Sequence, residues 1–115
     1  MNGDEAEAIA ANYLRAHKHK IIEQNYRIPS GEIDIISKDN GTLVFVEVKY
    51  LKSIKQYFPE EQVSPSKQRK LFKAAKSYLQ VNKYDGECRF DVLAIHGERD
   101  KLLFDHFIDA LEFNF

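Results

Sequence analysis

The chain has 115 residues, of which 43% are hydrophobic and 30% are charged, and its formal net charge is −1 at pH 7. This length predicts one domain, spanning residues 1–115, with enough apolar residues for a real core. The charge balance argues against a protein that coats nucleic acid through a global positive field, so any phosphate contact must come from a local basic patch. The single cysteine, Cys88, excludes an internal disulfide and gives no sign of a zinc site.

Hydropathy predicts a soluble protein of the cytoplasm with no membrane partner. The first residues are acidic and lack the apolar core of a signal peptide. No apolar run approaches the roughly 20 residues that a membrane-spanning helix needs.

The first half of the chain predicts a helix and a three-stranded meander. Residues from about Asp4 to His17 have an amphipathic pattern that suits a helix covering a sheet. A strand from Lys20 to Ile28 ends at a turn, Pro29-Ser30-Gly31. A β-hairpin follows, with strands over Gly31 to Ile36 and Phe45 to Lys49 around a two-residue turn at Asn40-Gly41.

The second half predicts one more helix and two more strands. The segment from Lys52 to Ser64 has little periodicity, and its length suits a mobile flap beside a site. Ser64 and Pro65 then suit the N-cap and first turn of a basic amphipathic helix over Ser66 to Val81. Apolar strands are expected over 89–96 and 101–108, which gives an α/β fold with a mixed, mostly antiparallel central sheet and flanking helices.

Charged residues alternate with apolar ones in the predicted hairpin. With Asp39 paired to Thr42, Asp34 falls opposite Glu47 and Glu32 falls opposite Lys49, while Ile33 and Ile35 share the other face. Two carboxylates about 5 Å apart repel by roughly 3 kcal/mol at an effective dielectric of about 20. A bound Mg²⁺ would offset this repulsion, because Mg²⁺ in proteins is typically held by one or two carboxylates plus waters. The alternative is a solvated sheet face on which Glu32 simply pairs with Lys49.

The hairpin string Gly-Glu-Ile-Asp-Ile-Ile, followed by Leu-Val-Phe-Val-Glu-Val-Lys, resembles the YraN family of small bacterial proteins. That family is similar to Holliday junction resolvases within the PD-(D/E)XK nuclease superfamily. The resemblance covers nearly the whole chain, including the opening helix, the residues before the hairpin, and Arg89-Phe90-Asp91-Val92. It implies a restriction-endonuclease-like mixed sheet with flanking helices.

By this resemblance, Asp34 and Glu47 are expected to bind the metal, Mg²⁺ or Mn²⁺, and Lys49 to be the catalytic lysine. Glu7 resembles the helix-borne glutamate that completes many resolvase sites, with Glu5 as a competing candidate. From the residues alone, the favoured interpretation of either glutamate is a solvated acid in a first turn, where the helix dipole stabilises it. Glu32 is expected to support the site.

The expected function is metal-dependent hydrolysis of phosphodiester bonds in DNA, with branched or repair intermediates as candidate substrates. A phosphate-contacting surface is expected from lysines in and before the second helix, namely Lys52, Lys67, Lys70 and Lys73. The alternative reading of these lysines is a solvated helix face. Asp91 is expected to pair with Arg89 or a lysine rather than to bind metal, and the two histidines His96 and His106 are expected to be surface or packing residues.

Two other functional classes fit the same sequence. One is a nucleic-acid-binding module that keeps the fold and the basic surface but not the chemistry. The other is a protein-interaction module acting through the aromatic tail, Phe113 to Phe115, which also suits a homodimer contact or completion of the core.

Overall fold

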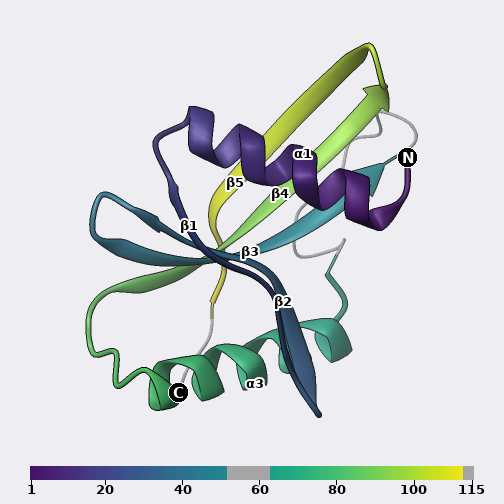
Figure 1. Cartoon of the computed structure of the whole chain (residues 1–115). Helices are drawn as coiled ribbons and strands as arrows, with labels where there is room; N and C mark the ends of the chain where they lie inside the picture. The colour runs from purple at the N-terminus through teal and green to yellow at the C-terminus, as the bar shows by residue number, and fades with distance from the viewer. Residues whose placement is uncertain (52–62, 113–115) are drawn as a thin grey trace.

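A computed structural model describes residues 1–51 and 63–112 as a five-stranded mixed sheet with one helix on each side (Figure 1). Strands β1 to β5 lie in sequence order across the sheet; β3 and β4 are parallel, and every other neighbouring pair is antiparallel. This confirms the expected fold class. The elements are α1 (Gly3–Ala16), β1 (Lys20–Ile28), β2 (Gly31–Asp39), β3 (Thr42–Leu51), α3 (Pro65–Val81), β4 (Cys88–Glu98) and β5 (Lys101–Leu111).

Both helices begin at side-chain caps. The Asn2 side chain accepts a hydrogen bond from the Glu5 backbone N–H at 2.9 Å, so α1 begins one residue earlier than expected. The Ser64 hydroxyl accepts one from the Lys67 N–H at 3.1 Å, and Pro65 occupies the first turn of α3, as predicted.

The hairpin turn fixes the register between β2 and β3. Asn40 and Gly41 have φ angles of 49° and 89°, the left-handed conformation that a type I′ turn requires. Asp39 is therefore the partner of Thr42, and the pairing continues to Ile35 and Val46. The predicted register is confirmed over this stretch.

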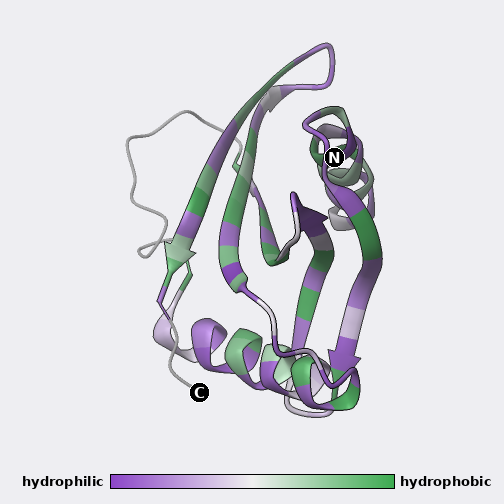
Figure 2. Cartoon of the chain, turned by 90° about the vertical axis from the view of Figure 1, so that its left-hand side faces the viewer, coloured by the Kyte–Doolittle hydropathy of each residue, from purple (hydrophilic) through white to green (hydrophobic). Residues whose placement is uncertain are grey.

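The sheet buries apolar residues on both faces. The α1 face holds one cluster, with Leu14 of the helix packed on Ile35 and Val46. The α3 face holds a second cluster, in which Leu71 packs with Phe45 and other residues of β2 to β5. Figure 2 shows hydrophobic and hydrophilic bands following one another along the strands. Runs of successive buried residues occur in β2, β3 and β4, because their side chains point alternately to the two buried faces.

The alternation breaks at Asp34. Ile33 belongs to the α3 cluster and Ile35 to the α1 cluster, so the expectation that they share a face is wrong. In the partner strand, Asn25 adopts a left-handed φ of 54° between the partners of these two isoleucines. Beyond this point β2 stays with β1, whereas β3 stays with β4, and Figure 1 shows the two hairpin strands diverging.

Several expectations fall at the ends of elements or outside the described residues. Strands β4 and β5 are longer than predicted and run to Glu98 and Leu111. The predicted flap lies mostly in 52–62, and the aromatic tail at 113–115, both outside the described residues. Over 1–51 and 63–112, no helix is long and apolar enough to cross a membrane.

Candidate active site

Asp34 lies where β2 separates from β3. Its Oδ2 accepts a hydrogen bond of 2.8 Å from the backbone N–H of Val48. A carboxylate thus takes the place of a strand–strand hydrogen bond just past the last paired residues, Ile35 and Val46. This contact holds Asp34 against β3, beside Glu47.

Glu47 is a buried acid, only 4% exposed, and it has Asp34 within hydrogen-bonding reach. Burial and the charge of Asp34 raise the pKa of Glu47 from 4.5 to about 8, although Lys67 and Lys49 act in the opposite direction. Its Oε2 atom is buried and has no hydrogen-bond partner. A buried acceptor of this kind needs a proton or a cation.

Glu7 of α1 lies within electrostatic range of Asp34. Burial first, and then the charge of Asp34, raises its pKa, and its Oε1 is also buried without a partner. Glu5, the competing candidate, instead forms an ion pair with Arg99. Burial therefore raises the pKa of both Glu47 and Glu7, and the charge of Asp34 adds to the effect.

These oxygen donors suit a hard divalent cation, but they do not form a complete cage. Across the described ranges, no group of three His, Cys, Asp or Glu side chains is arranged to hold a metal ion. Glu7 therefore does not combine with Asp34 and Glu47 into a ready three-carboxylate site. A site with two carboxylates still matches the usual coordination of Mg²⁺, which keeps several water ligands.

Lys49 and Glu32 do not pair as the simple register suggested. Lys49 is half-buried two residues after Glu47, on the same face of β3, and its backbone partner is Ala94 of β4. Glu32 is instead the strand partner of Arg27, and its carboxylate lies 3.3 Å from the Arg27 Nε. The divergence of β2 and β3 at Asp34 thus corrects the expected Glu32–Lys49 opposition.

Lys67 of α3 connects Glu32 to the carboxylate pair. Its Nζ lies 3.7 Å from Glu32 Oε1 and 3.8 Å from Glu47 Oε1. The sequence placed Lys67 in the phosphate-contacting surface but gave no sign of these two contacts.

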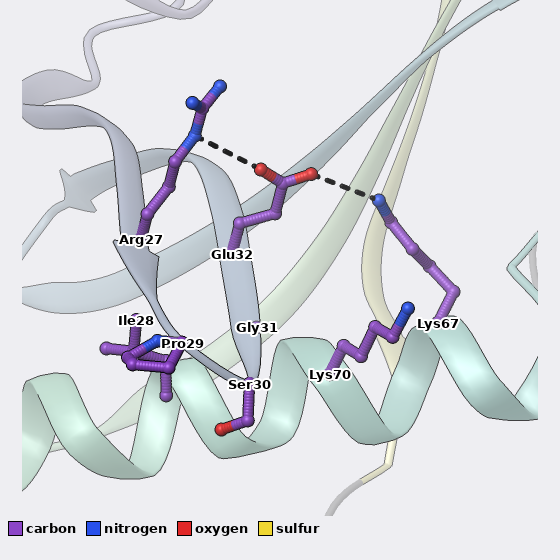
Figure 3. A pocket seen from close by; sticks show the side chains of 8 residues that line it. All are labelled: Arg27, Ile28, Pro29, Ser30, Gly31, Glu32, Lys67 and Lys70. Atoms are coloured by element: carbon purple, nitrogen blue, oxygen red, sulfur yellow. Dashed lines mark ion pairs between the residues drawn. The ribbon is translucent and has the colours of Figure 1, made fainter.

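A pocket of about 320 Å³ lies on the Glu32 side of Lys67 (Figure 3). Its wall consists of the β1–β2 turn and two lysines of α3, namely Arg27, Ile28, Pro29, Ser30, Gly31, Glu32, Lys67 and Lys70. Of the lysines expected to contact phosphate, Lys73 is exposed on α3 outside this pocket, and Lys52 lies outside the described residues. Sequence reasoning missed Arg27 and Ser30, whose only signal was their position beside a turn.

A second polar cluster is centred on Asp91 and lies apart from the carboxylate pair. Asp91 is fully buried and accepts hydrogen bonds from Arg89 at 2.9 and 3.1 Å and from the Asp109 N–H at 2.9 Å, with the ring of His106 2.8 Å away. Burial alone would raise the pKa of Asp91, but these hydrogen bonds outweigh it and lower the pKa. The predicted pairing with Arg89 is confirmed.

Side-chain hydrogen bonds around the Asp91 cluster also link neighbouring strands. Arg89 reaches Asp39 at 3.0 Å, and the buried His19 ring contacts Ser37 at 2.9 Å. The serine is fully buried, so no substrate could reach it. His96 lies 3.0 Å from Asp105 and is buried, as expected of a packing residue.

Comparison with known proteins places the chain in one family. The model of the family described as "Uncharacterised protein family UPF0102" matches residues 6–95. A UPF0102 protein of Chlorobium phaeobacteroides is 45% identical over 97% of this chain and 94% of its own length. A UPF0102 protein of Lachnoclostridium phytofermentans is 44% identical over 90% of this chain and 89% of its own. The chain therefore belongs to the UPF0102 (YraN) family, as the hairpin motif indicated.

Proposed function

We propose that this protein is a metal-dependent nuclease that hydrolyses phosphodiester bonds in DNA, with branched or repair intermediates as its substrates. The observation that carries this proposal is the Asp34–Glu47 pair, in which a buried carboxylate with a pKa of about 8 keeps one oxygen without a partner. Strongly perturbed acids of this kind cluster at functional sites. A purely structural pair would be expected to have its oxygens satisfied by donors.

The oxygen donors of the pair fit Mg²⁺ or Mn²⁺. Asp34, Glu47 and the backbone carbonyl of Val48 would hold the ion, and Glu7 would approach it through water, since the side chains do not form a three-ligand cage. When bound, the ion lowers the pKa of a coordinated water and polarises the phosphate.

The basic residues around the pair supply the rest of the chemistry. Lys49, on the face of Glu47, orients the attacking water and neutralises the negative charge that develops on the phosphate. Lys67 already balances the charge of Glu47 from 3.8 Å, and it is placed to contact the substrate phosphate at the same point. Lys70 and Lys73 of α3 attract the strand through salt-dependent contacts.

A cleavage assay tests this proposal. Purified protein is incubated with branched, single-stranded and duplex DNA, and with RNA, in Mg²⁺ or Mn²⁺ and in EDTA. The wild type should cut DNA only with metal, whereas Asp34→Asn and Lys49→Ala should bind DNA without cutting it. Removal of a metal ligand or of the lysine abolishes transition-state stabilisation, while the basic helix still holds the substrate.

Contradictory outcomes point to different alternatives. Binding of nucleic acid without metal-dependent cleavage on any substrate would favour the non-catalytic binding module on the same fold. Cleavage by Asp34→Asn at the wild-type rate would show that the pair is not the site. Charge reversal at both Lys70 and Lys73 should weaken binding and leave divalent-metal affinity unchanged, which separates substrate binding from the metal site.

A further inference from the structure

The pocket beside the carboxylate pair is a preformed cavity. Gly31 lies so close to α3 that a β-carbon at this position would overlap the carbonyl oxygen of Lys70. The turn of Pro29 and Ser30 is thereby held against the helix. This backbone contact sets one wall of the pocket; in Figure 3 Arg27 and Lys67 point toward Glu32 between them, and Lys70 extends from α3 beside Lys67.

The charges in this pocket favour an anion. Three cations line it, namely Arg27, Lys67 and Lys70, against the single carboxylate of Glu32. Glu32 pairs with Arg27 and Lys67, but its side chain is 45% exposed and that of Arg27 is 70% exposed, so solvent screens these pairs. No ion pair is recorded for Lys70 with any residue in the described ranges. A phosphate can therefore displace Glu32 from these cations at little cost.

The pocket also borders the candidate active site at Lys67. The Lys67 ammonium lies 3.7 Å from Glu32 in the pocket and 3.8 Å from Glu47 in the carboxylate pair. One cation thus borders both spaces. Two neighbouring phosphates of one strand could therefore lie on either side of Lys67, one in the pocket and one at the carboxylate pair.

We propose that this pocket binds a backbone phosphate of a nucleic-acid strand, next to the phosphate that lies at Asp34 and Glu47. This inference deepens the proposed function and rests on its nucleic-acid substrate. The strand passes over Lys67, with Arg27 and Lys70 holding the neighbouring phosphate and the Ser30 hydroxyl available as a further donor.

The exposure of the cations favours a strand over a free phosphate ion. Sites built from exposed cations bind a lone anion weakly, because water and salt compete for each contact. A phosphate tethered in a strand gains from its effective concentration once the rest of the strand is held. The volume lies near the lower end for ligand pockets and leaves room for one such group together with water molecules.

The test is a binding measurement without metal. Wild-type protein in EDTA is titrated with a single-stranded oligonucleotide at several salt concentrations, with inorganic phosphate, and with an oligonucleotide whose methylphosphonate backbone is uncharged. The variant is Arg27→Gln with Lys70→Gln. The matched control is Lys76→Gln, an exposed lysine of α3 outside the pocket. Lys67 is left intact because it also contacts Glu47.

The double variant should lose about tenfold in oligonucleotide affinity, the loss expected for charge-assisted hydrogen bonds to one phosphate. The slope of log affinity against log salt should fall by about 0.7, as for one phosphate on a single strand. The control should change less than about twofold. In the wild type, the amide NMR signals of Ser30 and Gly31 should shift with the charged oligonucleotide and not with the methylphosphonate.

Three results would overturn the inference. In the first, the double variant and the control have the same oligonucleotide affinity and the same salt dependence. In the second, inorganic phosphate binds the pocket as tightly as the oligonucleotide does. In the third, the wild type does not bind the oligonucleotide. These readouts are independent of catalysis. A protein that does not cut DNA can still lose oligonucleotide affinity in the double variant, as the inference requires. A nuclease in which the pocket plays no part would keep both its cleavage and its affinity in that variant.

Discussion

Replacement of Glu47 by glutamine should stabilise the metal-free protein at alkaline pH. The pKa of Glu47 rises from 4.5 in the unfolded chain to about 8 in the folded protein, because the carboxyl group is buried beside Asp34. As pH increases, the unfolded chain therefore loses this proton first. The free energy of unfolding falls between about pH 5 and pH 8 and then levels off.

The size of this effect follows from the pKa. Each pKa unit corresponds to about 1.36 kcal/mol, so the rise from 4.5 to about 8 amounts to roughly 5 kcal/mol of lost stability. That is comparable with the whole stability of many domains. Glutamine has nearly the same shape, cannot ionise, and can donate a hydrogen bond to Asp34, so Glu47→Gln should escape most of this loss.

Urea unfolding in EDTA at pH 5 and at pH 8.5 measures the effect. Glu47→Gln should be within about 1 kcal/mol of the wild type at pH 5 and several kcal/mol more stable at pH 8.5. Glu98→Gln, at an exposed position, should match the wild type at both pH values. Added Mg²⁺ should stabilise the wild type at pH 8.5 but not Glu47→Gln. Equal stability of wild type and Glu47→Gln at pH 8.5 would refute the buried-pair argument.

Two other substitutions test the packing around the sites. Asp91→Asn should cost about 3–5 kcal/mol in urea unfolding, because it removes the charge of the fully buried partner of Arg89 and leaves the guanidinium with Asp39. A cost below about 1 kcal/mol would contradict the role of that cluster. Gly31→Ala should destabilise the protein and shift the amide NMR signals of α3 near Lys70, whereas Gly3→Ala, which meets no neighbouring atom, should leave both unchanged.

Local patterns were sufficient for most of the fold. The bounds of β1 match the expectation residue for residue, and the caps of α3 follow from Ser64 and Pro65. The hairpin register follows from the Asn40-Gly41 turn, because only a few residue types adopt φ angles above zero without strain. These features depend on neighbours in sequence, which is why the sequence reveals them.

The local geometry at Asp34 was not predictable in the same way. A strict period of two assumes regular strands, whereas the two residues that flank Asp34 lie on opposite faces of the sheet, beside the left-handed Asn25 of β1. Asparagine tolerates this conformation, but the sequence does not say that it adopts it inside a strand. The carboxylates Asp34 and Glu47 are brought together nevertheless, while Glu32 is turned toward Arg27.

Contacts between segments that lie far apart in the sequence could not be predicted either. The pocket depends on the close approach of Gly31 in β2 to the backbone of Lys70 in α3. The Asp91 cluster depends on the antiparallel pairing of β5 with β4, which brings His106 to Asp91. Neither contact is marked by a characteristic spacing of residues in the sequence. Arg27 could have been singled out only as a cation next to a turn that leads into the charged hairpin.

The most direct test of the account is whether a divalent cation binds between Asp34 and Glu47. Crystals of the wild type and of Asp34→Asn, soaked in Mn²⁺, can be compared by anomalous diffraction, which detects the ion independently of activity. We predict an anomalous peak in contact with both carboxylates of the wild type and none at this position in the variant. A wild-type crystal with no peak there, at a Mn²⁺ concentration that occupies other sites, would contradict it.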